Sequence, residues 1–178
     1  KNTGDSLSID KEKIDLGFNW ADESDWAAED KVTLVNLKDS PLAYDVSFKC
    51  CGLGENKTAQ GIKASVTESH LTMDPKSIAN LGFSIAISQN SDVPNGRYNG
   101  FLEISSKTEN FTVPVTFFKG YGVRVYYSGG APNVLSFYKN SLTEIFAFPG
   151  NNNDSTIFYL TEAGPWFLQG VWSGDEDA

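Results

Sequence analysis

The chain has few of the residues from which metal sites and nucleic-acid surfaces are built. Its 178 residues include only two cysteines and one histidine, and 14 Lys and Arg stand against 23 Asp and Glu. A structural zinc site recruits several Cys and His ligands, so we do not expect one. A net charge of −9 without a basic cluster argues against nucleic acid or an anionic membrane as a partner. No apolar run approaches the ~18 residues that span a bilayer, so membrane insertion is not expected.

The two cysteines, Cys50 and Cys51, are adjacent in the sequence. Neighbouring Cα atoms lie ~3.8 Å apart across a trans peptide, which is below the usual span of a disulfide, so we do not expect a bond between them. Alternation along the predicted strand places Cys50 on the apolar face as a buried, inert thiol. Cys51 is expected on the polar face, either free or paired with a second chain.

Apolar residues are nevertheless abundant: 40% of the chain is hydrophobic and 13% is aromatic, enough for a packed core. Residues 80–119 predict three antiparallel strands, because apolar and polar side chains alternate with a period of two between turn-forming residues. The expected inward sets are Leu81, Phe83, Ile85 and Ile87; Tyr98, Leu102 and Ile104; and Phe111, Val113, Val115 and Phe117.

Further strands are predicted before this block, at residues 31–37, 44–51 and 62–66, with shorter apolar pulses at 7–9 and 14–18. Residues 19–30, with two tryptophans among acids, are predicted to form a loop, and residues 70–77 a connection. Seven or eight short strands at regular spacing predict an all-β, immunoglobulin-like antiparallel β-sandwich over residues 1–120.

The pattern changes after Gly120–Gly122. Five more strands are predicted, at residues 123–127, 134–138, 144–148, 156–160 and 166–172. Their aromatic residues occupy both parities, which indicates strands covered on both sides or an aromatic binding surface. We therefore expect a second, smaller β domain over residues 121–178.

Part of the chain is similar to a known family. The segments KVTLVNLKDSPLAYDVSF (31–48), LTMDPKSIANLGFSIAIS, VPNGRYNGFLEISS and FTVPVTFFKG resemble the fibronectin type III-like domain that follows the catalytic domain in secreted subtilisin-like serine proteases. The shared features include Ala43-Tyr44, a Gly-x-Tyr-x-Gly segment from Gly96 to Gly100, and Val113-Pro114. The opening IDLG with VTLVNL is also similar to immunoglobulin-like modules of bacterial surface proteins. The resemblance covers about residues 7–119 and implies a non-catalytic accessory module on an exported protein; the protease triad has no counterpart here.

The residues offer candidates for two kinds of chemistry, hydrolysis and calcium binding. Glu68, Ser69 and His70 are adjacent, and neighbouring strand residues point apart, whereas a hydrolase needs its serine, histidine and acid to converge from separate segments. No enzyme activity is expected. Calcium takes oxygen ligands alone, so Asp22, Glu23 and Asp25, or residues 151–154, are weak candidates. Neither cluster has an EF-hand loop, and solvated acidic surface is the plainer interpretation.

Exposed aromatic rings are the remaining candidates for a binding site. Trp166, Trp172, Tyr126 and Tyr127 could stack on sugar rings or contact a protein, although tryptophans that close the sandwich and join the domains are the simpler explanation. The leading hypothesis is a non-catalytic accessory or structural module of a secreted or cell-surface protein, or of a periplasmic one, that contacts neighbouring domains of the same polypeptide. The resemblance implies that this polypeptide is a subtilisin-like protease and that the module belongs to its C-terminal region. The alternative is an adhesin-like module that binds polysaccharide or a cell-surface protein.

Overall fold

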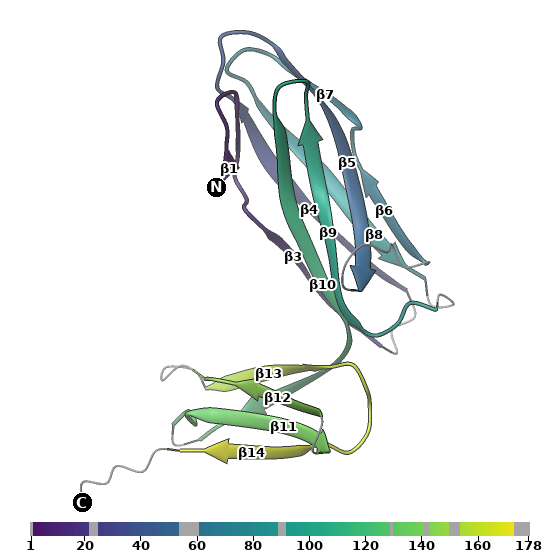
Figure 1. Cartoon of the computed structure of the whole chain (residues 1–178), viewed down its shortest axis with the longest axis vertical. Helices are drawn as coiled ribbons and strands as arrows, with labels where there is room; N and C mark the ends of the chain where they lie inside the picture. The colour runs from purple at the N-terminus through teal and green to yellow at the C-terminus, as the bar shows by residue number, and fades with distance from the viewer. Residues whose placement is uncertain are drawn as a thin grey trace, which may run out of the picture. The chain divides into compact units, whose positions relative to one another are not determined.

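The structure, a computed structural model, describes residues 2–21, 25–53, 61–88, 92–128, 130–140, 143–149 and 154–172. All of the regular elements in these ranges are strands (Figure 1). They are β1 (Asn2–Thr3), β2 (Leu7–Ile9), β3 (Ile14–Trp20), β4 (Trp26–Asn36), β5 (Leu42–Leu53), β6 (Ile62–Val66), β7 (His70–Met73), β8 (Ile78–Ile87), β9 (Gly96–Ser105), β10 (Asn110–Tyr126), β11 (Val134–Asn140), β12 (Thr143–Ala147), β13 (Ser155–Leu160) and β14 (Phe167–Val171). The predicted all-β, antiparallel fold class is confirmed.

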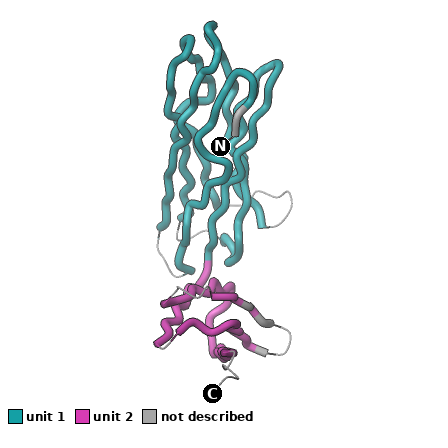
Figure 2. Tube along the Cα trace, turned by 90° about the vertical axis from the view of Figure 1, so that its left-hand side faces the viewer, with its two compact units in different colours: residues 1–119 teal, residues 120–178 magenta. Residues whose placement is uncertain are grey.

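The chain divides into two compact units, Lys1–Lys119 and Gly120–Ala178 (Figure 2). The sequence Gly120–Gly122 was expected to interrupt the strands, but β10 continues without a break from Asn110 to Tyr126. Its first part pairs with β9 in the first unit, and residues 121–126 pair with β13 in the second. Glycine is compatible with extended backbone when both neighbours supply pairing, so these residues do not end the strand.

The first unit is an immunoglobulin-like sandwich. One sheet has the order β1-β2-β4-β8-β6, and the other contains β10-β9-β5-β7, with β3 pairing to β10. Across the first sheet, β2, β4, β8 and β6 correspond to strands A, B, E and D of an immunoglobulin domain. In the second sheet, β5, β9 and β10 correspond to strands C, F and G. These seven strands have the arrangement of a constant-type immunoglobulin domain, and β1, β3 and β7 are additional to it.

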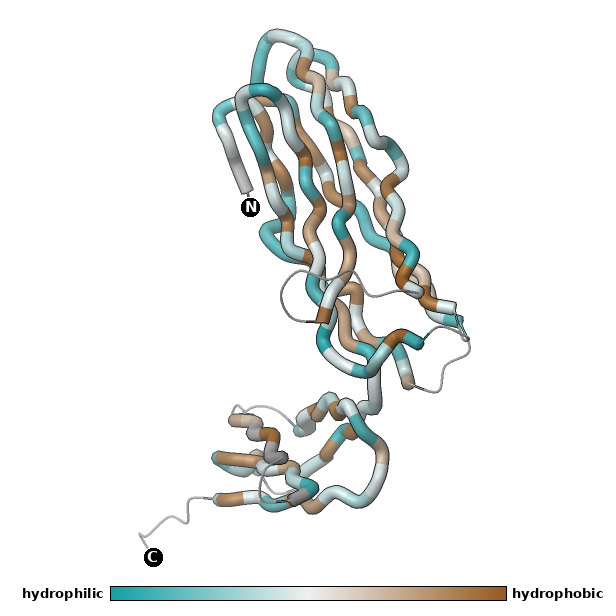
Figure 3. Tube along the Cα trace, turned by 45° about the vertical axis from the view of Figure 1, so that its right-hand side comes forward, coloured by the Kyte–Doolittle hydropathy of each residue, from teal (hydrophilic) through white to brown (hydrophobic). Residues whose placement is uncertain are grey.

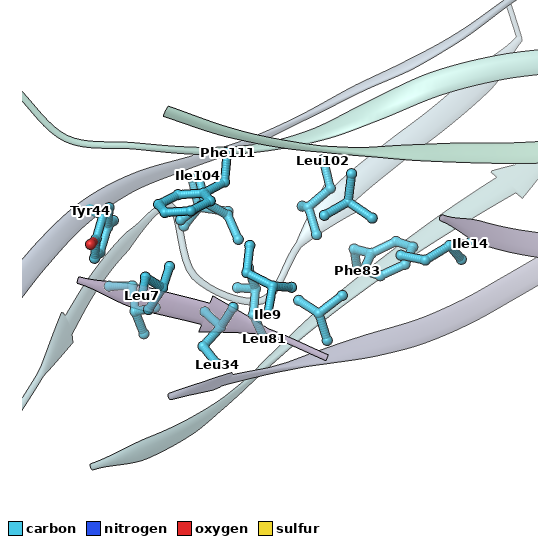
Figure 4. Packing of buried hydrophobic residues seen from close by; sticks show 14 of the residues in the cluster. Leu7, Ile9, Ile14, Leu34, Tyr44, Leu81, Phe83, Leu102, Ile104 and Phe111 are labelled. Carbon is cyan, nitrogen blue, oxygen red and sulfur yellow. The ribbon is translucent and has the colours of Figure 1, made fainter. Parts of the chain in front are cut away.

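The core between these sheets follows from the two-residue period. Apolar and polar positions alternate along the strands of the first unit (Figure 3), and all eleven predicted inward residues of β8, β9 and β10 are buried. Leucine, isoleucine and phenylalanine side chains from both sheets meet between the layers (Figure 4). Burial of such side chains contributes about 1.5–3 kcal/mol each relative to exposure, so this face drives the folding of the unit.

Tyr98 fixes the turn that leads into β9. Its side chain is fully buried, its ring stacks on Phe117 at 4.7 Å, and its hydroxyl donates a hydrogen bond to the carbonyl of Pro94, 2.5 Å away. A tyrosine that bonds to backbone a few residues upstream at this corner is a hallmark of immunoglobulin-like sandwiches. Burial raises the pKa of Tyr98 to about 12.

Two segments predicted as loop or connection are strands. Residues 26–30, assigned to a loop, form the first half of β4 and pair with β8, and residues 70–73 form β7 and pair with β5. Trp26 and Ala28 alternate inward with Ala27 and Glu29 outward, but small alanines on both faces conceal the period. In β7 only Leu71 and Met73 are buried, too few residues for a pattern to be recognised.

The burial predicted for Cys50 is confirmed, but the predictions of no disulfide and of an exposed Cys51 were wrong. Cys50 and Cys51 are joined by a disulfide, and both side chains are buried. The peptide between them is cis, with the Cα atoms 3.1 Å apart, whereas the prediction assumed a trans bond. The register of β5 against β9 shifts between Lys49 and Gly52, so strict alternation fails at this point and both sulfurs face the core.

The second unit is a small sandwich of its own. The second part of β10 pairs with β13, and β12-β11-β14 form a three-stranded sheet. Leu135 and Phe137 from β11 meet Phe158 and Leu160 from β13 in its core. Phe137 stacks on Phe158 at 5.0 Å, so aromatic packing replaces part of the aliphatic core found in the first unit.

Candidate functional site

The only histidine lies in a polar row across the outer face of β9, β5 and β7. Asp45 is opposite His70 on one side and opposite Ser105 on the other. Nδ1 of His70 and Oδ1 of Asp45 are 2.7 Å apart, and both side chains are exposed. The strand pairing has thus brought an acid, a histidine and a serine from three segments onto one row.

The order within this row does not match a hydrolase. In a catalytic triad the histidine lies between the serine and the acid, so that it can accept the hydroxyl proton. Here Asp45 occupies the middle strand, and the strands of His70 and Ser105 are therefore separated by two interstrand spacings, about 10 Å. Ser69 and Glu68, adjacent to His70 in sequence, are not part of the row. The arrangement provides an exposed ion pair and no activated nucleophile.

A second polar group surrounds a shallow depression on the outer face of β4, β8 and β6, over Gly82. Thr67 fills the place where Gly82 lacks a side chain, and the two residues exchange hydrogen bonds. At its margin, Asp30 holds Nζ of Lys11 at 2.6 Å. Burial opposes ionisation of Asp30, but the hydrogen bonds from Lys11 and from the Lys31 amide outweigh it and hold the pKa of Asp30 below its usual value. A carboxylate kept charged and paired in this way is a structural group and not a proton donor.

The calcium candidates do not form a recognisable site in the described part of the chain. Asp25 is exposed just before β4, while Asp22 and Glu23 lie outside the described residues, as do residues 151–153 of the second cluster. Asp154 is described and is exposed. Within the described ranges no three His, Cys, Asp or Glu side chains are grouped closely enough to hold a metal ion.

The four aromatic candidates are distributed over different parts of the second unit. Tyr127 packs against the core, and its hydroxyl forms a hydrogen bond with the hydroxyl of Thr156. Trp166 also packs on the core, with its ring 5.9 Å from that of Phe137. Tyr126, by contrast, is 72% exposed at the end of β10, where the guanidinium of Arg124 lies over its ring. Two of the four are therefore partly structural.

Trp172 is the exposed member of the tryptophan pair. It is 57% exposed, its indole nitrogen donates a hydrogen bond to the carbonyl of Gly130, and its ring lies over Gly170. A side chain on Gly170 would meet this ring at 2.5 Å, so the glycine makes room for the tryptophan. The ring is consequently held in place while much of it remains open to solvent.

Residues that sequence reasoning did not select extend the exposed aromatic surface. Phe167 is 57% exposed on the outer face of the β12-β11-β14 sheet, where its ring stacks on Tyr138 at 5.4 Å. Tyr159 and Ile157 are exposed on the outer face of β13. Aromatic residues at both odd and even positions of a strand indicate rings on both of its faces. When both faces are apolar, the sequence does not say which of them packs on the core.

Two outward surfaces can accordingly be distinguished in the second unit. The β13 surface consists of Arg124, Tyr126, Ile157 and Tyr159, and the β14 surface consists of Tyr138, Phe167 and Val171. The ring of Trp172 lies on the other face of β14, over Gly170. Each surface carries apolar and aromatic side chains that remain exposed in the folded unit.

No helix capable of crossing a membrane occurs in the described ranges.

No protein-family model and no curated protein matches the chain. Among solved structures, the secreted serine protease VesC from Vibrio cholerae is similar over 95% of this chain and 47% of its own, with 14% identity and a TM-score of 0.47. The class 5 fimbriae chaperone CfaA is similar over 94% of this chain and 99% of its own, with 10% identity and a TM-score of 0.43. A family 123 glycoside hydrolase from Clostridium perfringens is similar over 61% of this chain at 16% identity and a TM-score of 0.45. The chain spans only 22% of that hydrolase.

Proposed function

We propose that this chain is a non-catalytic accessory module of an exported protein, located at the cell surface, outside the cell or in the periplasm. The observation that carries the proposal is the row of His70, Asp45 and Ser105, in which the acid separates the base from the hydroxyl. The other polar groups described above hold strands together. The module would contact and position neighbouring domains of its polypeptide, as the similarity of residues 7–119 to fibronectin type III-like domains of subtilisin-like proteases implies.

The disulfide between Cys50 and Cys51 supports export, because disulfides persist in oxidising compartments and are rare in the cytosol. Its formation can be tested by directing the chain to the bacterial periplasm and measuring the intact mass before and after reduction. An exported product lighter by two hydrogen atoms, with no alkylation after unfolding, is the expected result. Two free, alkylated thiols in the exported protein would remove this support.

The absence of catalysis is tested by assaying the whole chain on casein and on generic ester substrates, beside His70→Ala and Ser105→Ala. No turnover above buffer is expected for any of the three proteins. Turnover that co-purifies with the wild-type chain and disappears in His70→Ala would contradict the proposal. If activity is equal in all three proteins and separates from the chain in a further chromatography step, it comes from a contaminant.

A second candidate function, binding of polysaccharide or of a cell-surface protein, is favoured by the exposure of Tyr126 and Trp172. Affinity electrophoresis in gels that contain a soluble polysaccharide tests it, with Tyr126→Ala and Trp172→Ala as the informative variants. Because Trp166 packs on Phe137, its replacement would disturb the fold and serves poorly as a probe. Retardation that either variant abolishes would support sugar binding, and unretarded migration of the wild type in every gel would contradict it.

A further inference from the structure

The free edge of β14 lies in a long uncharged stretch. The sequence from Ala163 to Gly174 contains no charged residue, in a chain with a net charge of −9. The edge strand β13 also carries no charged residue, but Asp154 and Glu162 flank it closely. By contrast, the edge strand β6 carries Lys63, and β7 carries His70. β14 has no proline, and its pairing with β11 shows no register shift.

An edge of this kind is open to pairing. A strand at the border of a sheet presents unpaired N–H and C=O groups, and native proteins usually protect such borders with charged side chains, proline or bulges. β14 lies at the border of the β12-β11-β14 sheet and has none of these devices. Its side chains Phe167, Leu168 and Val171 are also among the exposed large apolar residues. Backbone and side chains together therefore favour the addition of a strand.

We propose that β14 pairs in antiparallel fashion with β14 of a second copy of this chain, about a two-fold axis at Gln169. In this register Phe167 faces Val171 of the second copy, and Leu168 faces Gly170 of the second copy. The pairing joins two three-stranded sheets into one six-stranded sheet. It goes beyond the accessory role proposed above and does not depend on it.

Self-pairing is favoured over a foreign strand by symmetry and by charge. The two-fold places Leu168 opposite Gly170 of the second copy, where it would lie next to the Trp172 ring that covers this glycine. On the outer face, Phe167, already stacked on Tyr138, gains Val171 of the second copy as a cross-strand neighbour. Two chains of the same negative charge repel each other, and an uncharged edge is where they can approach at least electrostatic cost.

Association should be weak and should stop at the dimer. Five paired residues bury less than a standard protein interface, so dissociation constants in the micromolar to millimolar range are expected. Each copy contributes one β14 edge, so a two-fold pairing uses both edges and closes. Analytical ultracentrifugation of the full chain up to about 1 mM is expected to show a monomer–dimer equilibrium. A wild-type chain that stays monomeric over this range would overturn the proposal, as would open-ended polymers.

Introducing a charged side chain at Gln169, which lies on the proposed two-fold axis, tests the register. Gln169 is exposed and would face itself across the pair. Gln169→Lys and Gln169→Glu should each weaken the dimer about five-fold or more through like-charge contact, whereas an equimolar mixture should associate at least as well as the wild type. High salt should reduce the advantage of the mixture. Thr72→Lys, on edge strand β7 of the first unit, is the matched control and should dimerise like the wild type.

Cross-linking provides a measurement that does not depend on affinity. Opposed Cα atoms in an antiparallel pair are about 4.5–5.5 Å apart, within the range that a disulfide spans. Gln169→Cys is therefore expected to form a covalent dimer rapidly under mild oxidation, and Phe167→Cys to do so much more slowly. Circular dichroism and melting temperatures must match the wild type for each variant that is compared. Charged variants that dimerise like the wild type, or equal cross-linking at both positions, would overturn the pairing.

Discussion

The hydroxyl of Tyr44 donates a hydrogen bond to Oε2 of Glu109 across 3.0 Å. The other carboxylate oxygen of Glu109 accepts a hydrogen bond from the backbone amide of Ser6 at 3.2 Å. One half-buried side chain, placed just before β10, therefore holds β5 and the link between β1 and β2. These segments are far apart in sequence, so the contact ties the first strands of the chain to the middle of the sandwich.

Tyr44→Phe removes this hydroxyl while leaving the ring, which packs edge-on to Phe111. We expect the free energy of unfolding to fall by about 1–3 kcal/mol, since the bond to a charged group is lost in a partly buried place. Chemical denaturation of both proteins measures the difference. Tyr126→Phe, at an exposed ring, is the control and should be unchanged within about 0.5 kcal/mol. Equal stability of Tyr44→Phe and wild type would show that the bond contributes nothing.

Alkaline pH should destabilise the first unit. Burial, followed by the hydrogen bond to Glu109 and its negative charge, raises the pKa of Tyr44, and burial raises the pKa of Tyr98 to about 12. Both phenols titrate near 10 in the unfolded chain. The stabilisation that these two groups give the folded state is complete below about pH 10. It is lost as pH rises from there through their pKa values in the folded state, because in this range the unfolded chain releases the phenol protons and the folded chain retains them.

Urea unfolding between about pH 8 and about pH 11 tests this dependence. The free energy of unfolding should change little from these groups up to about pH 10 and decline above it. Tyr98→Phe should begin less stable, since Pro94 loses its partner, but should decline less steeply. Parallel curves for variant and wild type would contradict the assignment.

Gly100 allows β9 to approach the shifted part of β5. A Cβ at this position would meet the carbonyl oxygen of Lys49 at 2.8 Å and Sγ of Cys51 at 3.0 Å. Backbone atoms cannot move aside as a flexible side chain can, so Gly100→Ala should lower the free energy of unfolding by about 1–3 kcal/mol. Asn99→Ala, one residue earlier and exposed, is the matched control. A Gly100→Ala protein as stable as the control would mean that β5 can relax away from β9.

The ion pair between Asp45 and His70 should contribute little to stability. Both side chains are exposed, and such pairs typically give about 0.2–1 kcal/mol in double-mutant cycles. Asp45→Asn, His70→Gln and the double variant form the cycle, measured by thermal unfolding at low and at high salt. The coupling should be small and should weaken with salt. A coupling that is large or insensitive to salt would point to a role other than a surface contact.

Much of the first unit could be predicted because side-chain direction on a strand is a local property. Phe83, Leu102 and Val113 were assigned to the core from alternation alone, and all three are buried. The same rule failed at Cys51, where a register shift against β9 breaks the alternation. It also failed at Trp26, since alanines on both faces of β4 hide the period.

The candidate sites were less accessible to such reasoning. Sequence placed Ser69 and Glu68 beside His70, but the partners that strand pairing supplies are Asp45 and Ser105, from distant segments. Trp166 and Trp172 were grouped together, yet one packs on Phe137 and the other is exposed beside Gly130. Aromatic content indicated that exposed rings would exist, but not which ones.

The sequence by itself determined the all-β class, the buried face of each alternating strand and the anionic surface with few metal-binding side chains. These properties depend on residue type and on the two-residue period, which act within one strand. Only the tertiary structure decided that Asp45 separates His70 from Ser105, that both cysteines lie inside, and that β14 remains at an open edge. Each of these depends on which strands become neighbours, and that choice is made by the packing of segments remote in sequence.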